Sequence, residues 1–175
     1  MTPQRKTYED SCAVLTTKGL LEATVPPMRD RMPSYDDEEP LGVSFFRTQV
    51  EGEDLSRLSL PRSFFGRSLI SKSRWTGSDL SESRMCWNDF EDCDFEGALL
   101  VGSDLRASNF DRCSFAGADL SGADLRRSNF EECSFAGANV SGVRLTEEQV
   151  QGLGLDARQR TSVSIEDEGE EPGGG

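Results

Sequence analysis

Histidine is absent from the 175 residues of this sequence. Its absence excludes Ser-His-Asp and Cys-His catalysis, zinc or haem bound through histidine, and a histidine pH switch. Long apolar runs are also missing: the longest have four or five residues, such as Cys12 to Leu15, whereas a membrane helix needs about 20. We therefore expect a cytoplasmic protein that is not an enzyme and uses neither a cofactor nor a metal.

Basic residues are few. The sequence has 19 lysines and arginines against 32 aspartates and glutamates, so its formal net charge is −13. This balance disfavours direct binding to nucleic acid or to an anionic membrane. The five cysteines are an odd number, which argues against a disulfide framework and for reduced thiols. With 35% hydrophobic residues, the composition is that of one modest soluble domain with tails.

Two terminal segments have compositions that cannot form a core. Residues 1–40 hold five of the seven prolines and the acidic run Asp36 to Glu39. We expect a disordered N-terminal tail there, with at most a short helix near Leu20 to Thr24. Residues 161–175 contain five acids and end in glycines, which predicts a disordered acidic tail.

The segment between these tails is repetitive. From Leu60 to Leu145 every fifth residue is large and apolar, eighteen times in succession. The residue two before each of these centres is small: from Ser63 to Ala138, fifteen of sixteen are serine, alanine or cysteine. A period of five fits neither a helix nor a strand, so the chain must turn a corner once per repeat.

A second period sets the number of sides. Residues 105–124 and 125–144 are identical at 13 of 20 positions, so four units of five residues complete one coil. Coils stacked about 4.8 Å apart would share one core, with the large and the small residue of each unit pointing inward. The other three positions would face water. The predicted core includes Phe90, Phe95, Leu105, Phe110, Phe115, Leu120, Leu125, Phe130 and Phe135, with Cys93, Cys113 and Cys133.

These units resemble the motif A(D/N)LXX of the pentapeptide repeat protein family. The resemblance implies a right-handed quadrilateral parallel β-helix, an all-β fold, over residues 60–145. It implies no particular activity, because most members of the family have none that is known. The matching units are Ser78-Asp79-Leu80, Ser103-Asp104-Leu105, Ser108-Asn109-Phe110, Ala118-Asp119-Leu120, Ala123-Asp124-Leu125, Ser128-Asn129-Phe130 and Ala138-Asn139-Val140.

Both ends of the repeat region need a cap. Residues 41–59 keep apolar centres but place Thr48 and Glu53 where small residues belong, so they form either an irregular first coil or an N-terminal cap. Residues 146–160 begin with Thr146 followed by two glutamates, which predicts a C-terminal capping helix with Thr146 as N-cap.

Several residue columns allow a chemical and a structural interpretation. Cys93, Cys113 and Cys133 lie one coil apart, and sulfurs in a straight column cannot converge on one zinc ion, so we interpret them as core thiols. By the same register Cys86 faces water, and Cys12 lies in the tail. The recurrent Asp and Asn before each centre are expected to bond nearby backbone at the corners rather than to act in catalysis. They are Asp79, Asp89, Asp104, Asn109, Asp119, Asp124, Asn129 and Asn139.

Charge divides the solenoid along its length and around its sides. Residues 41–75 have three acids and six basic residues, whereas residues 76–150 have fifteen acids and six arginines. One side carries an acidic stripe that includes a single arginine, Arg112, and the neighbouring side displays Arg84, Arg106, Arg126 and Arg127. The acidic stripe consists of Asp89, Glu91, Asp92, Asp111, Glu131 and Glu132. It is either a partner-binding surface or a solvated, salt-bridged face.

We therefore expect a non-enzymatic, rigid scaffold that binds an unidentified protein partner, and a homodimer is compatible with the sequence. The resemblance implies an alternative, because some pentapeptide repeat proteins mimic DNA, bind DNA gyrase or a related topoisomerase and protect it from quinolones or toxins. Residues 76–150 have a net charge of −9 along about 18 Å of the predicted solenoid. Duplex DNA of the same length carries about 11 phosphates, which is a similar charge density. The alternative is thus a DNA mimic with a resistance or immunity role.

Overall fold

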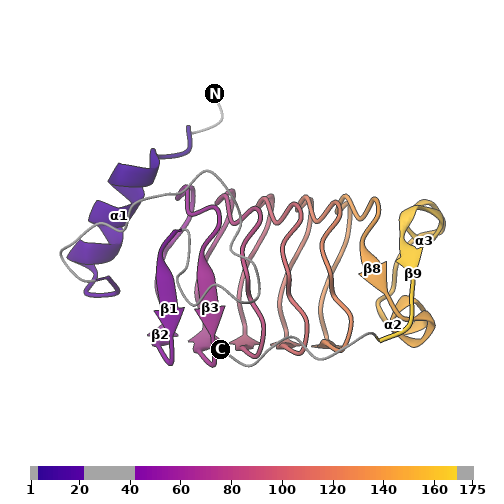
Figure 1. Ribbon diagram of the computed structural model, residues 1–175. Helices are drawn as coiled ribbons and strands as arrows, with labels where there is room; N and C mark the ends of the chain where they lie inside the picture. Colours follow the sequence, from indigo (N-terminus) through magenta and orange to yellow (C-terminus); the bar gives the residue numbers. More distant parts are fainter. Residues whose placement is uncertain (1–3, 22–41, 169–175) are drawn as a thin grey trace.

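The computed structural model describes residues 4–21 and 42–168, and its centre is a parallel β-solenoid of about six turns (Figure 1). Helix α1 (Tyr8–Thr17) lies at one end, and α2 (Glu147–Gly152) and α3 (Ala157–Ser162) lie at the other. No helix in these ranges is long and apolar enough to cross a membrane. The strands are β1 (Ser44–Phe46), β2 (Gln49–Glu51), β3 (Phe64–Gly66), β4 (Leu69–Ser71), β5 (Asp89–Glu91), β6 (Asn109–Asp111), β7 (Asn129–Glu131), β8 (Arg144–Leu145) and β9 (Ser164–Ile165).

Every strand pair has an offset of 20 residues. Phe45 pairs with Phe65 and Phe90 with Phe110, and isolated bridges such as Asp79 to Leu99 show the same offset on the other sides. One coil therefore has four sides of five residues, as predicted. We name the sides after their central residues in the third coil: the Met85, Phe90, Phe95 and Leu100 sides. The sheet of the Phe90 side has the strand order β2-β4-β5-β6-β7.

The predicted core is confirmed, with two exceptions. The centres from Phe45 to Leu145 are buried, and Phe110 is stacked between Phe90 and Phe130 at centroid distances of 4.9 and 5.0 Å. Phe130 and Cys133 are only partly buried. They belong to the last coil, on which no further coil stacks, and Phe130 lines a groove of about 470 Å³ beside α2.

The small inward residues join successive coils through buried hydrogen bonds. The Ser103 hydroxyl accepts from the N–H of Ser83 at 3.2 Å and donates to the carbonyl of Leu80 at 2.8 Å. The Cys93 and Cys113 thiols point in the same way at the carbonyls of Ile70 and Phe90. A small polar side chain at this position therefore satisfies backbone groups that the corner would otherwise leave buried and unpaired.

The N-terminal end differs from the expectation of a disordered tail over residues 1–40. The segment Tyr8–Thr17 is helix α1, whose first turn is capped by the Thr7 hydroxyl, which accepts from Asp10 N at 3.1 Å. Cys12 and Leu15 are fully buried and belong to the same apolar cluster as the solenoid core. The reason is that the first coil has an open apolar end, which this helix covers. The rest of the predicted tail, 22–40, and most of the short helix expected near Leu20 lie outside the described residues.

Residues 42–59 form a regular first coil rather than a cap. Strands β1 and β2 pair in register with β3 and β4, and Thr48 N donates to the Ser68 hydroxyl at 3.1 Å. Helix α1 takes the capping role instead. Its Ser11 hydroxyl accepts from Ser59 N at 2.8 Å, which fixes the helix on the edge of this coil.

The C-terminal cap is two short helices instead of the single one expected. Thr146 is the N-cap of α2, as predicted, and Asp156 is the N-cap of α3. The Gln149 amide donates to the carbonyls of Leu125 and Ser128. In the same way, the amide of Gln159 donates to the last-coil carbonyls of Phe135 and Ala138. These amides donate to backbone carbonyls of the last coil, which would otherwise lack a partner because no further coil stacks on it.

The predicted disordered tail from residue 161 onward is also wrong as far as residue 168. Residues 161 and 162 complete α3, and β9 pairs with β8, so that Ser164 lies beside Arg144. This strand again follows the 20-residue offset, because the backbone edge of β8 was free to accept one more strand. Residues 169–175 lie outside the described residues.

Replacing Phe110 by alanine should destabilise the protein by about 3 to 5 kcal/mol, because it leaves a cavity in a continuous column of rings. The free energy of unfolding in urea measures this. Ser121→Ala, on the outer surface of the Leu100 side, should change it by less than about 0.5 kcal/mol. Equal effects of the two changes would contradict the inward placement of Phe110.

Replacing Leu15 by alanine should loosen α1 from the first coil and cost about 2 to 5 kcal/mol of stability. It should also promote association, since the uncovered coil presents a free strand edge. Urea unfolding and size-exclusion chromatography measure the two effects. Thr17→Ala, at an exposed position of the same helix, is the control. A Leu15 variant as stable as this control would show that α1 does not cap the core.

Candidate partner-binding surface

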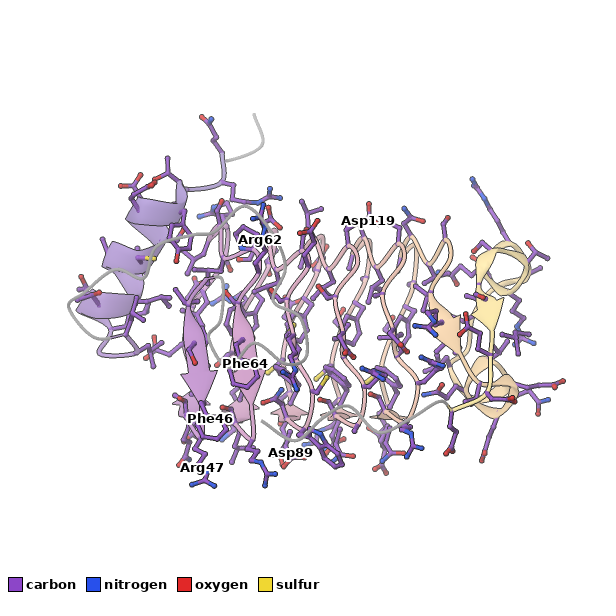
Figure 2. The ribbon with its side chains drawn as sticks, in the orientation of Figure 1. Phe46, Arg47, Arg62, Phe64, Asp89 and Asp119 are labelled. Carbon is purple, nitrogen blue, oxygen red and sulfur yellow. The ribbon has the colours of Figure 1, made fainter. Side chains whose placement is uncertain are left out.

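The Phe90 side brings the predicted acidic residues together on one surface. In β5, β6 and β7 the central phenylalanine points inward, so the residues on either side of it point outward. Pairing of these strands aligns Glu91, Asp111 and Glu131 in one column that runs along the solenoid. Asp89 begins a parallel column and is labelled in Figure 2. Asp92 and Glu132 lie at the corner that follows.

Arg112 divides this stripe into paired and unpaired carboxylates. Its guanidinium forms ion pairs with Asp92, at 2.7 Å, and with Asp111. The hydrogen bond from Arg112 holds the pKa of Asp92 below its ordinary value. In contrast, Glu91, Glu131 and Glu132 are exposed and form no ion pair with any described residue. Asp89 also has no ion pair and accepts only from the neutral Asn109 amide, so four of the six carboxylates in the stripe lack a charged partner among the described residues.

The column that begins with Asp89 is held by side-chain hydrogen bonds. The Asn109 amide donates to Asp89 at 2.7 Å, and the Asn129 amide donates to Asn109 at 2.9 Å. The expectation that these three residues bond nearby backbone is therefore wrong. They lie in the middle of flat strands, where the closest polar group is the same residue one coil away.

The expected backbone role is confirmed on the other sides. Asp79, Asp119 and Asn139 each accept from the N–H two residues later, at 3.0 to 3.2 Å. Asp104 and Asp124 accept in the same way from the backbone of Arg106 and Arg126. These bonds stabilise the corners rather than forming an array of free carboxylates.

The Met85 side does not have the basic stripe that the sequence suggested. Arg106 donates to both oxygens of Asp104 at 2.8 and 2.7 Å, and Arg126 binds Asp124 in the same way. Arg144 extends the network, with Asp124 at 3.0 Å and Glu166 at 2.6 Å. The side chains of the two aspartates, Asp104 and Asp124, and of Arg106 and Arg126 are buried.

The signal for this network was present in the sequence as Asp-Leu-Arg at 104–106 and again at 124–126. Residues i and i+2 of a strand lie on the same side of the sheet, so an acid and an arginine at that spacing can pair across the central leucine. The network neutralises its own charges. The acidic surface of the Phe90 side therefore adjoins a neutral surface in these coils.

Two cysteines lie where the sequence did not place them. Cys86 was expected to face water and Cys12 to lie in a tail, yet both are buried. Burial raises the pKa of each thiol above its ordinary value. Cys86 lies beside Asp104 and Arg106 of the next coil, and its thiol points toward the Asp104 carbonyl at 3.6 Å. Within residues 4–21 and 42–168, no cluster of three or more cysteine or acidic side chains could hold a metal ion.

The repeat geometry agrees with comparisons to known proteins. The family model for pentapeptide repeats matches eight copies, at residues 76–106, 89–127 and 113–147. Residues 76–147 therefore consist of pentapeptide repeats. No curated protein matches the sequence.

Several solved structures resemble the chain. A pentapeptide repeat protein from the Arabidopsis thaliana thylakoid lumen is 26% identical with a TM-score of 0.44, over 65% of this chain and 72% of that one. Rfr23 from the cyanobacterium Cyanothece 51142 is 20% identical with a TM-score of 0.33, over 55% and 83%. QnrB1, a plasmid-mediated fluoroquinolone resistance protein, is 15% identical with a TM-score of 0.39, over 70% and 69%.

Labelling of the folded protein with a maleimide should modify Cys133 first, because it is the one cysteine of the five that is not buried. The other four should react only after denaturant is added. At neutral pH the reaction should be slower than for a free cysteine, since the hydrogen bond with Cys113 raises the pKa of Cys133. Mass spectrometry of labelled peptides gives the order. Cys133→Ser should remove the early phase, and early labelling of Cys86 would contradict its burial.

Proposed function

We propose that this protein is a non-enzymatic scaffold that binds a protein partner through the acidic surface of the Phe90 side. The observation that carries the proposal is the arrangement of Glu91, Glu131 and Glu132, which are exposed and form no ion pair with a described residue, whereas Asp92 and Asp111 are paired with Arg112. They are attached to one straight, five-stranded sheet. A partner therefore meets fixed negative charges on a surface that needs no rearrangement.

The rigidity of this surface favours recognition. The backbone under Glu91 and Glu131 is held by parallel pairing to neighbouring coils, and the neighbouring Asn109 bridges to Asp89 and Asn129. Binding then costs little ordering entropy beyond that of the glutamate side chains. Glu91 and Glu131 are two coils apart, which places them about 10 Å from each other. The matching partner surface is a groove with basic side chains at that spacing.

The charge of this surface should control the rate of association. Reversing Glu91 and Glu131 to lysine should slow binding of the partner and reduce its dependence on salt, because electrostatic attraction steers the encounter. The matched control reverses Glu96 and Glu148, which are exposed on the Phe95 side and on α2. Both variants should keep the stability of the parent, since all four side chains face water.

The partner would be obtained by affinity capture from a bacterial lysate, followed by mass spectrometry, with the parent and both variants immobilised side by side. We expect at least one protein to be retained by the parent and the control variant but lost from the Glu91 and Glu131 variant. Surface plasmon resonance with that purified protein then gives the association rate at several salt concentrations. Equal binding by all three would contradict the proposal and make the stripe a solvated face.

DNA gyrase is the alternative partner, and the exposed acidic surface with Glu91 and Glu131 is the observation that favours it. A DNA mimic should inhibit gyrase supercoiling, or protect it from a quinolone, at micromolar protein. The Glu91 and Glu131 variant should lose this effect and the control variant should keep it. An unchanged supercoiling reaction would eliminate gyrase while leaving another basic partner to the capture experiment.

A further inference from the structure

A second surface, of opposite character, lies at the corner between the Met85 and Phe90 sides. Four large hydrophobic side chains are exposed among the described residues, and three of them gather here: Phe46, Leu69 and Trp87, at 41%, 36% and 37% exposure. Arg47, Arg67 and Trp87 occupy the same corner position in three successive coils. Figure 2 shows Phe46 and Arg47 together at the lower edge of the first coils. We call these five residues the Trp87 patch.

The two arginines of the patch keep their charge uncompensated. Arg47 lies over the Phe46 ring at 5.2 Å, and neither Arg47 nor Arg67 forms an ion pair with a described residue. Three other basic side chains of these coils are paired: Lys72 with Glu51, Arg62 with Glu82 and Arg74 with Asp54. In a chain of net charge −13, a local cluster of two free guanidinium groups with three apolar side chains is unusual.

The corner that holds Trp87 is an uncommon place for a bulky side chain. The φ of Trp87 is +61°, in the left-handed region that bulky residues rarely adopt. At the same corner position of the Phe95 side, glycine takes this conformation in four successive coils, at Gly77, Gly97, Gly117 and Gly137. A tryptophan here costs folding free energy and leaves a third of its surface in water. Arg47, Arg67, Ala107 and Arg127 have positive φ at this same corner, so the conformation belongs to the fold, and it is the exposed indole in line with Arg47 and Arg67 that suits this corner for binding.

The phenylalanines that support the patch are also specifically arranged. Phe46 and Phe64 stack at a centroid distance of 6.1 Å, and Arg84 lies over Phe64 at 5.6 Å. The rings lie across Gly66, where an added Cβ would come within 2.6 Å of Phe64. Glycine at this strand position lets the rings lie flat, which builds a continuous stack from Arg47 to Arg84. The apolar part of the patch is therefore a preformed platform.

We propose that the Trp87 patch binds an acidic peptide segment of a partner protein, one that carries an aromatic or aliphatic anchor between its carboxylates. Arg47 and Arg67 would bind the carboxylates, since guanidinium groups pair with them bidentately. Phe46, Leu69 and Trp87 would take the apolar anchor. A nucleic acid strand fits less well, because its regularly spaced phosphates would also face Asp89 and Glu91 on the next coil, whereas a peptide can confine its carboxylates to Arg47 and Arg67. This surface differs in charge and place from the one in the proposed function, so either can fail alone.

Tryptophan fluorescence makes the patch directly observable. The chain has two tryptophans, and Trp75 is fully buried, so acrylamide should quench Trp87 selectively. The probe is a panel of short synthetic peptides in which glutamate and aspartate surround one phenylalanine or leucine. We expect members of the panel to bind the full chain, to reduce quenching of Trp87 by about half, and to give saturable fluorescence polarisation when labelled. Panels with lysine in place of the acids, or with alanine in place of the anchor, should not bind.

Two variants locate the binding, and one controls for it. Trp87→Gly suits the local backbone, so it should leave stability unchanged or raised while weakening peptide binding about thirtyfold. Arg47→Glu combined with Arg67→Glu should weaken it at least as much. Arg57→Glu is the matched control, because Arg57 also has positive φ in the first coil but lies at the diagonally opposite corner.

The outcomes separate the alternatives. Loss of binding in both patch variants with retention in the Arg57 variant supports the proposal. The proposal is overturned if no acidic peptide of the panel binds, or if Trp87→Gly binds as tightly as the parent. Tighter binding of single-stranded oligothymidylate through the same residues would assign the patch to nucleic acid instead. Dimerisation of the free protein that Trp87→Gly abolishes, measured by sedimentation, would assign it to a second copy of the chain.

Discussion

The structure depends on one constraint, the backbone hydrogen bonding between successive coils at an offset of 20 residues. The N–H of Phe95 donates to the carbonyl of Ser114, and the N–H of Asn129 donates to the carbonyl of Ser108. This ladder places each residue directly beside its counterpart in the next coil. Columns of like residues therefore result, whether they are stacked rings, buried hydroxyls or surface charges.

Stacking like residues in columns is unfavourable in two places: at the ends of the solenoid and where a column carries charge. At the ends, the ladder leaves unpaired backbone, which Gln149 and Gln159 satisfy with side-chain amides and which β9 satisfies with one more strand. On the surface, identical charges in one column repel. The corner column with Arg112 avoids this by alternation of sign, whereas in the column from Glu91 to Glu131 only the middle carboxylate, Asp111, is paired with an arginine. A column of three carboxylates is thus a departure from what the fold favours.

The inward-facing and outward-facing residues of such a solenoid have different roles. Two of every five residues build the core and the coil-to-coil hydrogen bonds. The remaining three point outward, where some, such as Asp79 and Asp104, stabilise the corners and the others can vary with little effect on folding. The acidic surface and the Trp87 patch both lie in this variable set, around the Phe90 side. Because both are fixed to the same rigid sheet, their spacing is set by the coil rise, and a partner would meet them in constant relative positions.

The sequence by itself determined the repeat, the four-sided coil, and the inward residues from Leu60 to Leu125, because a strict period leaves one way to bury the large side chains. It also identified the Phe90 side as acidic and Thr146 as a helix cap. Only the tertiary structure decided the rest. The capping role of α1, the burial of Cys86, the pairing of Arg112 and the neutral network around Asp124 depend on contacts between segments or coils. Periodicity assigns a direction to each side chain, but which neighbour covers or neutralises it follows from packing in three dimensions.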